Sequence, residues 1–576
     1  MKVFWNKEPS QITGKSVILN LFQDLVGVVA FLMRFRHAAK KGAVVLCLLC
    51  GLALEAQAQQ RFDAAGEAGL LPSPGILMNG VVNLHAEGDA LWVGPFLNVT
   101  HDGGASWQVA DADSLAGLRN RVYSFDIDGD VIWAGLGISL NREIDGQTQE
   151  VDLARGFVFS EDGGETWTYR SFLAPSDNDP ATTGILDLPD DTLTTYGAVA
   201  LPTLAITVPE FSPPWDIDYD PLTGDVWTAN QFAGIRKSSD GGRTWQRIVL
   251  PPDTSRFISP DLGYEFPFFV QPSGIPIDQF AGLNFQTFAV LADAAGTVWA
   301  GAVGGLNRST DGGVSWWHFN VDDGFPGNWI ISIEEQARLG REPAIWAAAW
   351  PGTEEAGRFG VVVTRDGGET FEAVLRGERV YDFAFDGASV YVAGENGLFI
   401  SNDDGRTFRT VRDFFDPNQP DRTFRPGARV FSVELTGGAL WVGTEDGLFK
   451  STDGGLSWQV FRAEVPLSPD GLPPVVPPDR VPRVEAYAYP NPFSPAVDRF
   501  VRIRYKLEAD EAVEIRIFDF AMNLVRNLTD ERQSGGEREV SWDGTDNQGA
   551  RVANAPYFYA IEAGGETFWG KILVLE

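Results

Sequence analysis

An eight-residue pattern, Ser/Thr-x-Asp-x-Gly-x-Ser/Thr-Trp/Phe, occurs seven times in this chain and constrains its fold more than any other feature. The Asp side chain can accept hydrogen bonds from backbone N–H groups that a tight turn leaves unpaired. The Gly can take a positive φ, and the closing ring can pack between neighbouring sheets. The pattern therefore predicts seven copies of one turn between two strands. Its central aspartates are Asp102, Asp162, Asp240, Asp311, Asp366, Asp403 and Asp453.

The sequence around each turn repeats as well. An apolar-aromatic-apolar-small run lies upstream, such as ALWVG at 90–94, and another strand-like run precedes it, such as RVYSFDID at 121–128. Each unit reads as four strands, A to D, with the turn between C and D. Four short antiparallel strands form one blade of a β-propeller. We therefore expect a seven-bladed propeller over residues 78–463. Each unit holds all four of its strands, so ring closure should rely on packing.

The repeated turn resembles the Asp box, also called the bacterial neuraminidase (BNR) repeat, of sialidase-like propellers. The resemblance implies a structural role, because in sialidases these boxes lie far from the active site. Sialidase chemistry itself needs an arginine triad, a tyrosine paired with a glutamate, and an early F/Y-R-I-P segment. That segment does not occur here, and seven repeats exceed the six-bladed sialidase plan. A sialidase is therefore not expected.

Long insertions separate some of the units. In a four-stranded meander, the D–A and B–C connections emerge on one face of the propeller and the A–B and C–D turns on the other. Loops held by a rigid scaffold often carry function, so we predict a binding surface on the first face. The D–A insertions are 168–213, 246–284 and 409–428, and the B–C insertions are 137–155 and 350–359.

Aromatic residues in or beside these insertions are the candidate ligand contacts: Trp215, Phe268, Trp350 and Phe414. A group of exposed aromatic rings can form a platform for a ligand or a partner. The alternative is that these rings form small satellite cores beneath the long loops.

Two acidic residues are the candidate catalytic groups. Asp216 and Asp382 occupy matching positions near the start of strand A, next to the loop-rich face. Glycoside hydrolases need two carboxylates across a cleft, and solvated acids at a channel rim are the alternative. The Asp-x-Asp-x-Asp run at 216–220 lacks the Gly and Glu of a calcium loop. The histidines lack metal-site spacing, so we expect neither a metal nor a cofactor.

The N-terminal residues have the order of a secretory signal peptide. A basic segment at 34–41 and an apolar run at 43–54 precede Ala56-Gln57-Ala58, so we expect a leader over residues 1–58 with cleavage after Ala58. Met33 is the more natural start. The apolar run is too short for a permanent span, so the mature chain should have no transmembrane segment. An N-terminal extension, residues 59–77, follows.

The remainder of the chain predicts a linker and a second domain. Residues 464–482 contain seven prolines and should form an extended spacer. Residues 483–576 alternate as the strands of a small Ig-like β-sandwich do. YPNPFSP (489–495) and WDGTDNQG (542–549) are similar to the Ig-like domain of flagellar hook-capping proteins and to the C-terminal sorting domain of the type IX secretion system of Bacteroidota. One departure is Ala521-Met522-Asn523, which replaces the usual Gly-Arg or Gly-Lys turn.

These features together predict an all-β chain, a seven-bladed propeller followed by an Ig-like sandwich. The net charge of −34 argues against nucleic acid and anionic membranes as partners. We expect a secreted or cell-surface protein that binds a glycan, peptide or protein on the loop-rich face. Its export machinery would bind residues 483–576. The alternative is an extracellular glycoside hydrolase that acts on a polysaccharide.

Overall fold

The computed structural model describes residues 69–575 except for 112–114, 116–119, 145–146, 171–192, 197–198, 203–211, 232–233, 244, 263–282, 353–357, 418–426, 464–485 and 496–499. The expected leader and linker lie outside the described residues, and so does most of the expected N-terminal extension. Within the described residues the helical elements are two 3-10 turns, η4 (Leu283–Phe285) and η5 (Val321–Asp323). The remaining elements are strands, which confirms the all-β fold class.

Seven antiparallel sheets make up the first part of the described chain, and each contains one of the seven repeat turns. Their strands, grouped by sheet, are β2 (Leu84–Glu87), β3 (Ala90–Val93), β4 (Asn98–Thr100) and β5 (Trp107–Ala110); β6 (Arg121–Asp128), β7 (Val131–Ile144), β8 (Gln147–Ser160) and β9 (Thr168–Arg170); β12 (Pro214–Asp220), β13 (Asp225–Asn230), β14 (Gly234–Ser238) and β15 (Gln246–Arg247); β17 (Thr287–Ala292), β18 (Val298–Ala302), β19 (Leu306–Ser309) and β20 (Trp316–Phe319); β21 (Trp329–Gln336), β22 (Ala344–Trp350), β23 (Gly360–Thr364) and β24 (Glu372–Val374); β25 (Val380–Asp386), β26 (Ser389–Gly394), β27 (Gly397–Ser401) and β28 (Arg409–Val411); and β29 (Val430–Thr436), β30 (Ala439–Thr444), β31 (Gly447–Ser451) and β32 (Gln459–Phe461).

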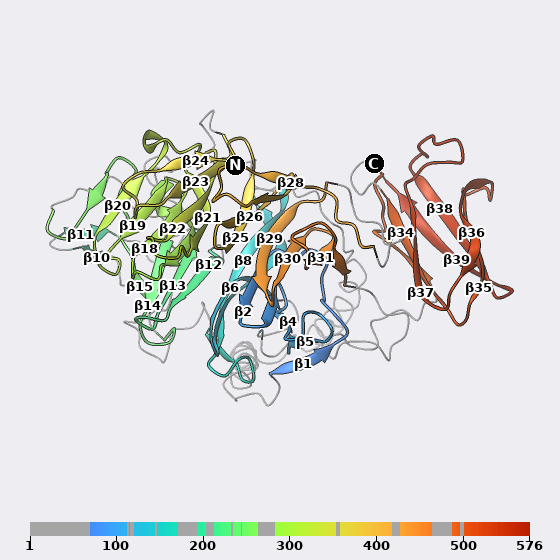
Figure 1. The fold of residues 1–576 in the computed structure, drawn as a ribbon, viewed down its shortest axis with the longest axis horizontal. Helices are drawn as coiled ribbons and strands as arrows, with labels where there is room; N and C mark the ends of the chain where they lie inside the picture. Colours follow the sequence, from blue (N-terminus) through green and yellow to red (C-terminus); the bar gives the residue numbers. More distant parts are fainter. Residues whose placement is uncertain are drawn as a thin grey trace, which may run out of the picture.

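The sheets form a ring (Figure 1), the arrangement in which the blades of a propeller surround a central channel. The first strand of each sheet contacts the first strand of the next sheet, and β29 contacts β2 to complete the ring. Every sheet takes its four meander strands from one continuous stretch of chain, so the ring closes without a swapped strand, as the repeat units predict. The closing seam is packed by a shared core that includes Val81, Leu91, Trp441 and Leu448.

Two sheets have a fifth strand on their outer edge. β1 (Leu70–Ser73), from the expected N-terminal extension, pairs with β5, and β16 (Phe257–Ile258) pairs with β20. A separate hairpin, β10 (Leu193–Tyr196) and β11 (Val199–Pro202), packs nearby, and the Tyr196 hydroxyl donates to the Val314 carbonyl at 2.6 Å. Parts of insertions 168–213 and 246–284 therefore cover the outer edge of the propeller. The expectation that all insertions gather on one face is wrong for these parts.

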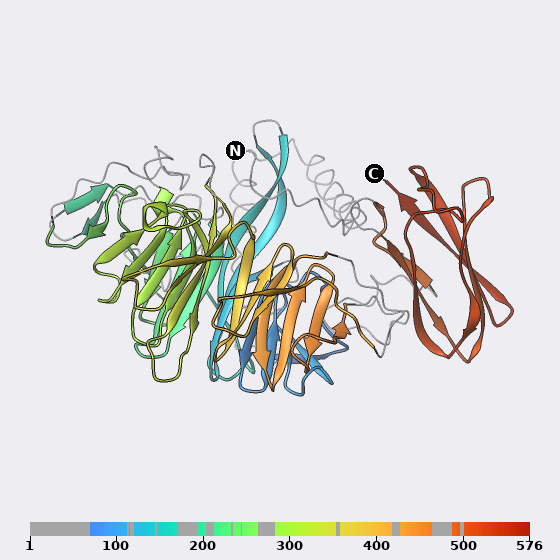
Figure 2. The same cartoon turned by 45° about the horizontal axis from the view of Figure 1, so that its top comes forward.

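The insertion expected as a loop at 137–155 is regular β-structure. Strands β7 and β8 extend as one long hairpin with paired residues from Ile132↔Ser160 to Ile144↔Gln147. Figure 2 shows this cyan hairpin rising beyond the neighbouring sheets. Its alternating sequence allows the strands to continue pairing after they leave the sheet stack.

The repeat turns share one hydrogen-bond pattern. In the last of them, the Ser451 hydroxyl donates to Asp453 at 2.7 Å and accepts from the Gly455 N–H at 2.8 Å. The Asp453 carboxylate also accepts from the Ser457 N–H and hydroxyl at 2.9 and 2.6 Å. The first two of these bonds recur in all seven turns. The aspartate therefore holds the turn closed, as the pattern predicts.

The recurrence of a tryptophan together with each of six turns has a packing reason. In six turns, a Cβ atom added to the fifth residue, a glycine, would lie 2.3 to 3.3 Å from a tryptophan ring of the preceding sheet. These tryptophans come from the apolar-aromatic runs upstream of the turns. The glycine–tryptophan pairs are Gly104–Trp441, Gly164–Trp92, Gly242–Trp133, Gly313–Trp227, Gly368–Trp299 and Gly405–Trp346.

A second domain follows the propeller (orange to red in Figure 1). One sheet has the order β33-β34-β37 and the other β36-β35-β38-β39. Their strands are β33 (Ala486–Tyr489), β34 (Val501–Leu507), β35 (Glu511–Phe518), β36 (Leu524–Gln533), β37 (Gly536–Trp542), β38 (Ala555–Ala563) and β39 (Glu566–Val574). The core between the sheets includes Phe493, Ile515 and Trp542. This arrangement confirms the β-sandwich. In the departure from the family turn, Met522 takes a positive φ of 63°.

A matched pair of glycines tests the packing of the repeat turns. Gly405→Ala should lower the free energy of unfolding by about 1–3 kcal/mol more than Gly387→Ala, because only the first Cβ meets the Trp346 ring. Both glycines have positive φ, 79° and 57°, so the backbone strain is shared. Chemical denaturation of the two variants measures the difference. Equal destabilisation would contradict the packing argument.

Candidate functional site at the mouth of the central channel

The inner strands share an irregularity near their starts. In six of the seven described inner strands, one residue is skipped in the pairing with the second strand, as between Pro214 and Asp216. Such a bulge turns the extra side chain in a new direction. The extra residues are Tyr123, Trp215, Phe288, Ile331, Tyr381 and Phe431.

Five of these residues are aromatic and join two tryptophans in a continuous arc. Neighbouring ring centroids lie 5.2 to 6.0 Å apart along the arc. We call this arc the aromatic collar, and in order around the channel it consists of Tyr123, Trp215, Phe288, Trp329, Trp350, Tyr381 and Phe431. The bulges lie at the start of β6, β12, β17, β25 and β29, and Trp350 lies at the end of β22, so the collar surrounds the mouth on the loop-rich face.

The first sheet does not contribute a ring to the collar. Val82, which precedes β2, is 40% exposed. Asn83 donates from its side chain to the Tyr123 carbonyl at 2.6 Å. The collar is therefore an open arc whose ends, Tyr123 and Phe431, flank the first sheet.

Polar contacts hold the collar rings in place on one side. The Trp350 indole N–H donates to the Val380 carbonyl at 2.9 Å, and the Arg379 guanidinium lies 4.1 Å from the Trp350 ring centroid. Glu395 accepts from Tyr381 at 3.0 Å and pairs with Arg379 at 3.2 Å. Burial raises the pKa of Tyr381, so its hydroxyl remains a hydrogen-bond donor. These rings are fixed before any ligand arrives, which reduces the entropy cost of binding.

The base of the long hairpin holds the other end of the collar. The Tyr123 hydroxyl donates to Asp152 at 2.7 Å, and Ser139 donates to the same carboxylate at 2.5 Å. A Cβ atom on Gly137 would lie 2.4 Å from the Tyr123 ring, so glycine at this position makes room for the ring. The hairpin insertion therefore positions a collar residue.

Carboxylates of the inner strands link neighbouring inner strands at three places in the ring, β6 to β12, β12 to β17 and β25 to β29. Asp216 accepts from the Val290 N–H at 2.9 Å and Asp382 from the Val433 N–H at 3.0 Å. Inner strands present unpaired N–H groups along their free edge. The carboxylates satisfy those groups across the gap between sheets. The four bonds of this kind are Asp126 to Tyr219, Asp216 to Val290, Asp218 to Ala292 and Asp382 to Val433.

These acids have unusually high pKa values. Burial among protein atoms raises the pKa of Asp216 and of Asp382 to about 7, and the charges of Asp126 and Asp382 add to the rise at Asp216. Burial and the nearby Asp382 raise the pKa of Glu434 to about 8. The pKa values of Asp218 and Glu334 are also raised, chiefly by burial. Burial therefore favours the protonated form of these five acids at a higher pH than is usual for carboxyl groups.

The structure places the predicted site residues in different environments. Trp215 and Trp350 belong to the collar, where Trp350 is only 7% exposed, and Asp216 and Asp382 belong to the inner-strand carboxylates. Phe414 is only 3% exposed and packs on Phe449 and Trp458, which is the position of a core residue. Phe268 lies outside the described residues. Among the described residues, no group of three His, Cys, Asp or Glu side chains could hold a metal ion.

Five collar residues were not singled out from the sequence: Tyr123, Phe288, Trp329, Tyr381 and Phe431. Three of them carry a visible signal, because RVY (121–123), RVY (379–381) and RVF (429–431) begin equivalent strands. Their shared position at the start of the first strand is the pattern that leads to the collar.

Residues 499–566 match the family of FlgD Ig-like domains. No curated protein matches the chain. Among solved structures, PorZ, described as an essential bacterial surface component of the type-IX secretion system of Porphyromonas gingivalis, is 15% identical, with a TM-score of 0.30, covering 86% of this chain and 75% of its own.

Two further structures are similar at the same level. YCF48 from Cyanidioschyzon merolae is 16% identical, with a TM-score of 0.37, covering 66% of this chain and 97% of its own. An ancestral GH74 enzyme is 15% identical, with a TM-score of 0.44, covering 88% of this chain and 64% of its own. Similarity of this degree does not identify a function. No helix of the described residues is long and apolar enough to cross a membrane.

The two groups of acids predict how stability depends on pH. Asp216, Asp382 and Glu434 have higher pKa values in the folded chain than in the unfolded chain, so their protonation favours the folded state. This contribution to stability is complete below pH about 4 and is lost as pH rises through about 7 to 8. Hydrogen bonds in the repeat turns lower the pKa of Asp102 and Asp403 to about 2, so their contribution is lost as pH falls from about 4 towards 2. Thermal unfolding from pH 2 to 9 should therefore show highest stability near pH 4 to 5.

Glu434→Gln separates the two effects. It should reduce the loss of stability between pH 5 and 8 and leave the acid side of the profile unchanged. Glu369→Gln is the control, because the Glu369 side chain is exposed. A parallel shift of the whole profile by Glu434→Gln would contradict the assignment.

Proposed function

We propose that this chain is an exported or cell-surface binding protein whose ligand docks on the aromatic collar. The observation that carries the proposal is the continuous arc of seven rings around one mouth of the propeller. The rings come from six different sheets, and polar contacts fix several of them. A surface assembled from so many blades is held rigidly by the scaffold, which suits it to recognition.

The chemistry of the mouth narrows the ligand class. Aromatic rings offer apolar faces and edges to sugar rings and to apolar side chains. The net charge of −34 on the chain makes a strongly anionic ligand unfavourable. We therefore favour a neutral or cationic ligand, either a glycan or a segment of a peptide or protein.

Collar variants test the proposal. Trp215→Ala and Tyr381→Ala should each weaken binding at least about tenfold, because each removes a ring from the collar. Trp317→Ala is the matched control, since Trp317 is 45% exposed but contacts Phe257 on the outer edge. Binding is measured against a panel of soluble neutral polysaccharides and basic peptides. A panel member that binds all three variants as it binds the native chain would contradict a collar site.

The second candidate function, glycoside hydrolysis, has one observation in its favour. Asp216 and Asp382 have pKa values of about 7, as a general acid at neutral pH requires. Against it, both carboxylates already accept two backbone N–H groups, which suits a structural role. The same polysaccharide panel, assayed for new reducing ends, decides between them. Hydrolysis that Asp216→Asn or Asp382→Asn abolishes would replace the binding proposal with an enzyme.

We also propose that the Ig-like domain directs export. The match to the FlgD Ig-like family over 499–566 and the YPNPFSP opening support this proposal. In a bacterium with a type IX secretion system, deletion of residues 483–576 should leave the protein in the periplasm. Surface labelling of whole cells measures its display. Normal display of the truncated chain would contradict a sorting role.

A further inference from the structure

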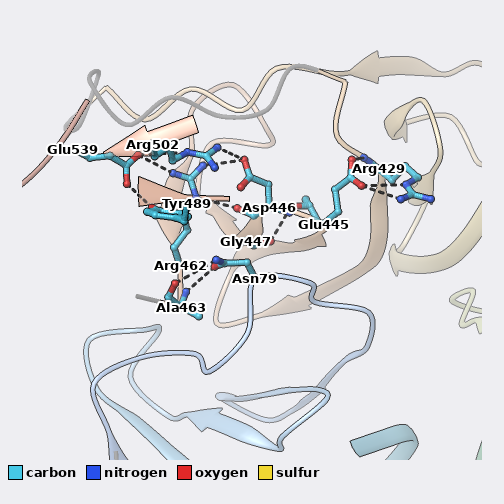
Figure 3. A network of polar contacts seen from close by, with 11 residues as sticks. Asn79, Arg429, Glu445, Asp446, Gly447, Arg462, Ala463, Tyr489, Arg502 and Glu539 are labelled. Atoms are coloured by element: carbon cyan, nitrogen blue, oxygen red, sulfur yellow. Dashed lines mark hydrogen bonds and ion pairs between the residues drawn. The ribbon is translucent and has the colours of Figure 1, made fainter. Parts of the chain in front are cut away.

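Four buried charges lie where the Ig-like domain meets the propeller (Figure 3). Asp446 and Arg462 belong to the last propeller sheet and its continuation, and Arg502 and Glu539 belong to β34 and β37 of the Ig-like domain. Their side chains are only 11%, 1%, 5% and 5% exposed, respectively. We call these four residues the charge quartet.

Each member of the charge quartet contacts two opposite charges. Asp446 pairs with Arg502 at 2.6 Å and with Arg462 at 3.1 Å. Glu539 lies 3.5 Å from Arg502 and 3.6 Å from Arg462. Glu539 also accepts from the Tyr489 hydroxyl at 2.5 Å. The quartet is electrically neutral and alternates in sign, which is the arrangement that makes burial of charge tolerable.

The strand pattern of the Ig-like domain shows that this face is covered. Along β34, Val501, Ile503 and Tyr505 point into the sandwich core, so Arg502 and Arg504 point outward. An arginine on the open face of a sheet is normally exposed. Here Arg502 and Arg504 are 4% and 3% exposed. The outward face of this sheet is therefore covered at these positions, and Asp446 of the propeller contacts it at Arg502.

The propeller side of the quartet adjoins the seam where the ring closes. The Asn79 side chain accepts from the Ala463 N–H at 2.7 Å and donates to the Ala463 carbonyl at 3.3 Å. The Asn79 carbonyl accepts from the Gly447 N–H at 2.8 Å, and the Val81 N–H donates to the Thr444 carbonyl at 2.9 Å. Ala463 directly follows Arg462, and Gly447 directly follows Asp446. The charge quartet therefore holds in place the two segments that hydrogen-bond to Asn79.

We propose that the Ig-like domain is a clamp on the closing seam of the propeller, fastened in one orientation by the charge quartet. No swapped strand ties the last sheet to the first, so contacts at the seam must keep the ring shut. Arg502 binds Asp446 from outside and fixes the β30–β31 turn that reaches Asn79. The domain thus has a structural task in the folded protein that is separate from any role in export.

The test uses the chain from residue 59 onward, with Arg502→Met from the Ig-like side and Asp446→Asn from the propeller side. Removal of one partner leaves a buried charge without compensation. Hydrogen exchange of the Val81 and Gly447 amides should become about tenfold faster or more in both variants. Arg516→Met is the control, because Arg516 pairs with Glu562 and Glu514 on the other sheet. Its seam amides should exchange at the native rate.

A distance measurement gives an independent readout. The chain beyond Cys50 contains no cysteine, so Leu222→Cys and Met522→Cys allow two labels at exposed positions, one in each domain. A single narrow distance is expected with native Arg502, and a broad distribution with Arg502→Met. Native seam exchange and a narrow distance in both quartet variants would overturn the proposal. Asp446→Asn lies outside the Ig-like domain, so misfolding of that domain cannot account for its result.

The clamp and the sorting role can fail separately. Arg502→Met keeps the whole Ig-like domain but loosens the clamp, whereas deletion of residues 483–576 removes both. Export that survives Arg502→Met and fails on deletion supports both proposals. If the seam amides of the quartet variants exchange at the native rate, only the clamp proposal is contradicted. If the chain without residues 483–576 is displayed on the cell surface, only the sorting proposal is contradicted.

Discussion

The contact between the glycine of a repeat turn and the tryptophan of the preceding sheet is the interaction on which the propeller depends. It joins the two motifs that recur along the chain, because the turn of one unit needs the ring of the unit before it. Adjacent sheets are thereby set at a fixed spacing, six times around the ring. In the seventh place Tyr391 stands in the second strand, and Gly455 packs on Ile400 instead. A fixed spacing brings the inner strands close enough for the carboxylates to bridge them.

Local patterns predicted the parts of the fold that local physics controls. The Asp and Gly of each turn have roles that follow from hydrogen bonding and φ alone, so the turns and the strands beside them were predictable. The continuation of β7 and β8 was not, because alternation over 137–155 fits a loop as well as a hairpin until a pairing partner is known. Strand β36 is hard to predict for a similar reason. Its sequence, LVRNLTDERQ, is polar and contains no buried residue, so it lacks the alternation that marks a half-buried strand.

The candidate site was predictable only in part because it is assembled from residues far apart in sequence. Trp215 and Trp350 were found by their nearness to insertions. Tyr381 and Phe431 lie within inner strands, and their shared feature is a bulge, which depends on the register between two strands. Phe414 illustrates the reverse case, since an aromatic residue in an insertion can equally fill a core. Asp216 and Asp382 were placed correctly near the start of the inner strands, but their backbone hydrogen bonds to the next sheet appear only in three dimensions.

The gap in the collar at Val82 removes the rotational equivalence of the positions around the mouth. A complete circle of equivalent rings would present the same surface to a ligand in several rotations about the channel axis. An open arc with Tyr123 at one end and Phe431 at the other has a beginning and an end. If the collar binds a ligand as we propose, a ligand that spans the arc has a single rotational setting, with the same part of it facing the first sheet. The near-symmetry of the seven sheets builds the scaffold, and the one place where it is broken would set the orientation of that ligand.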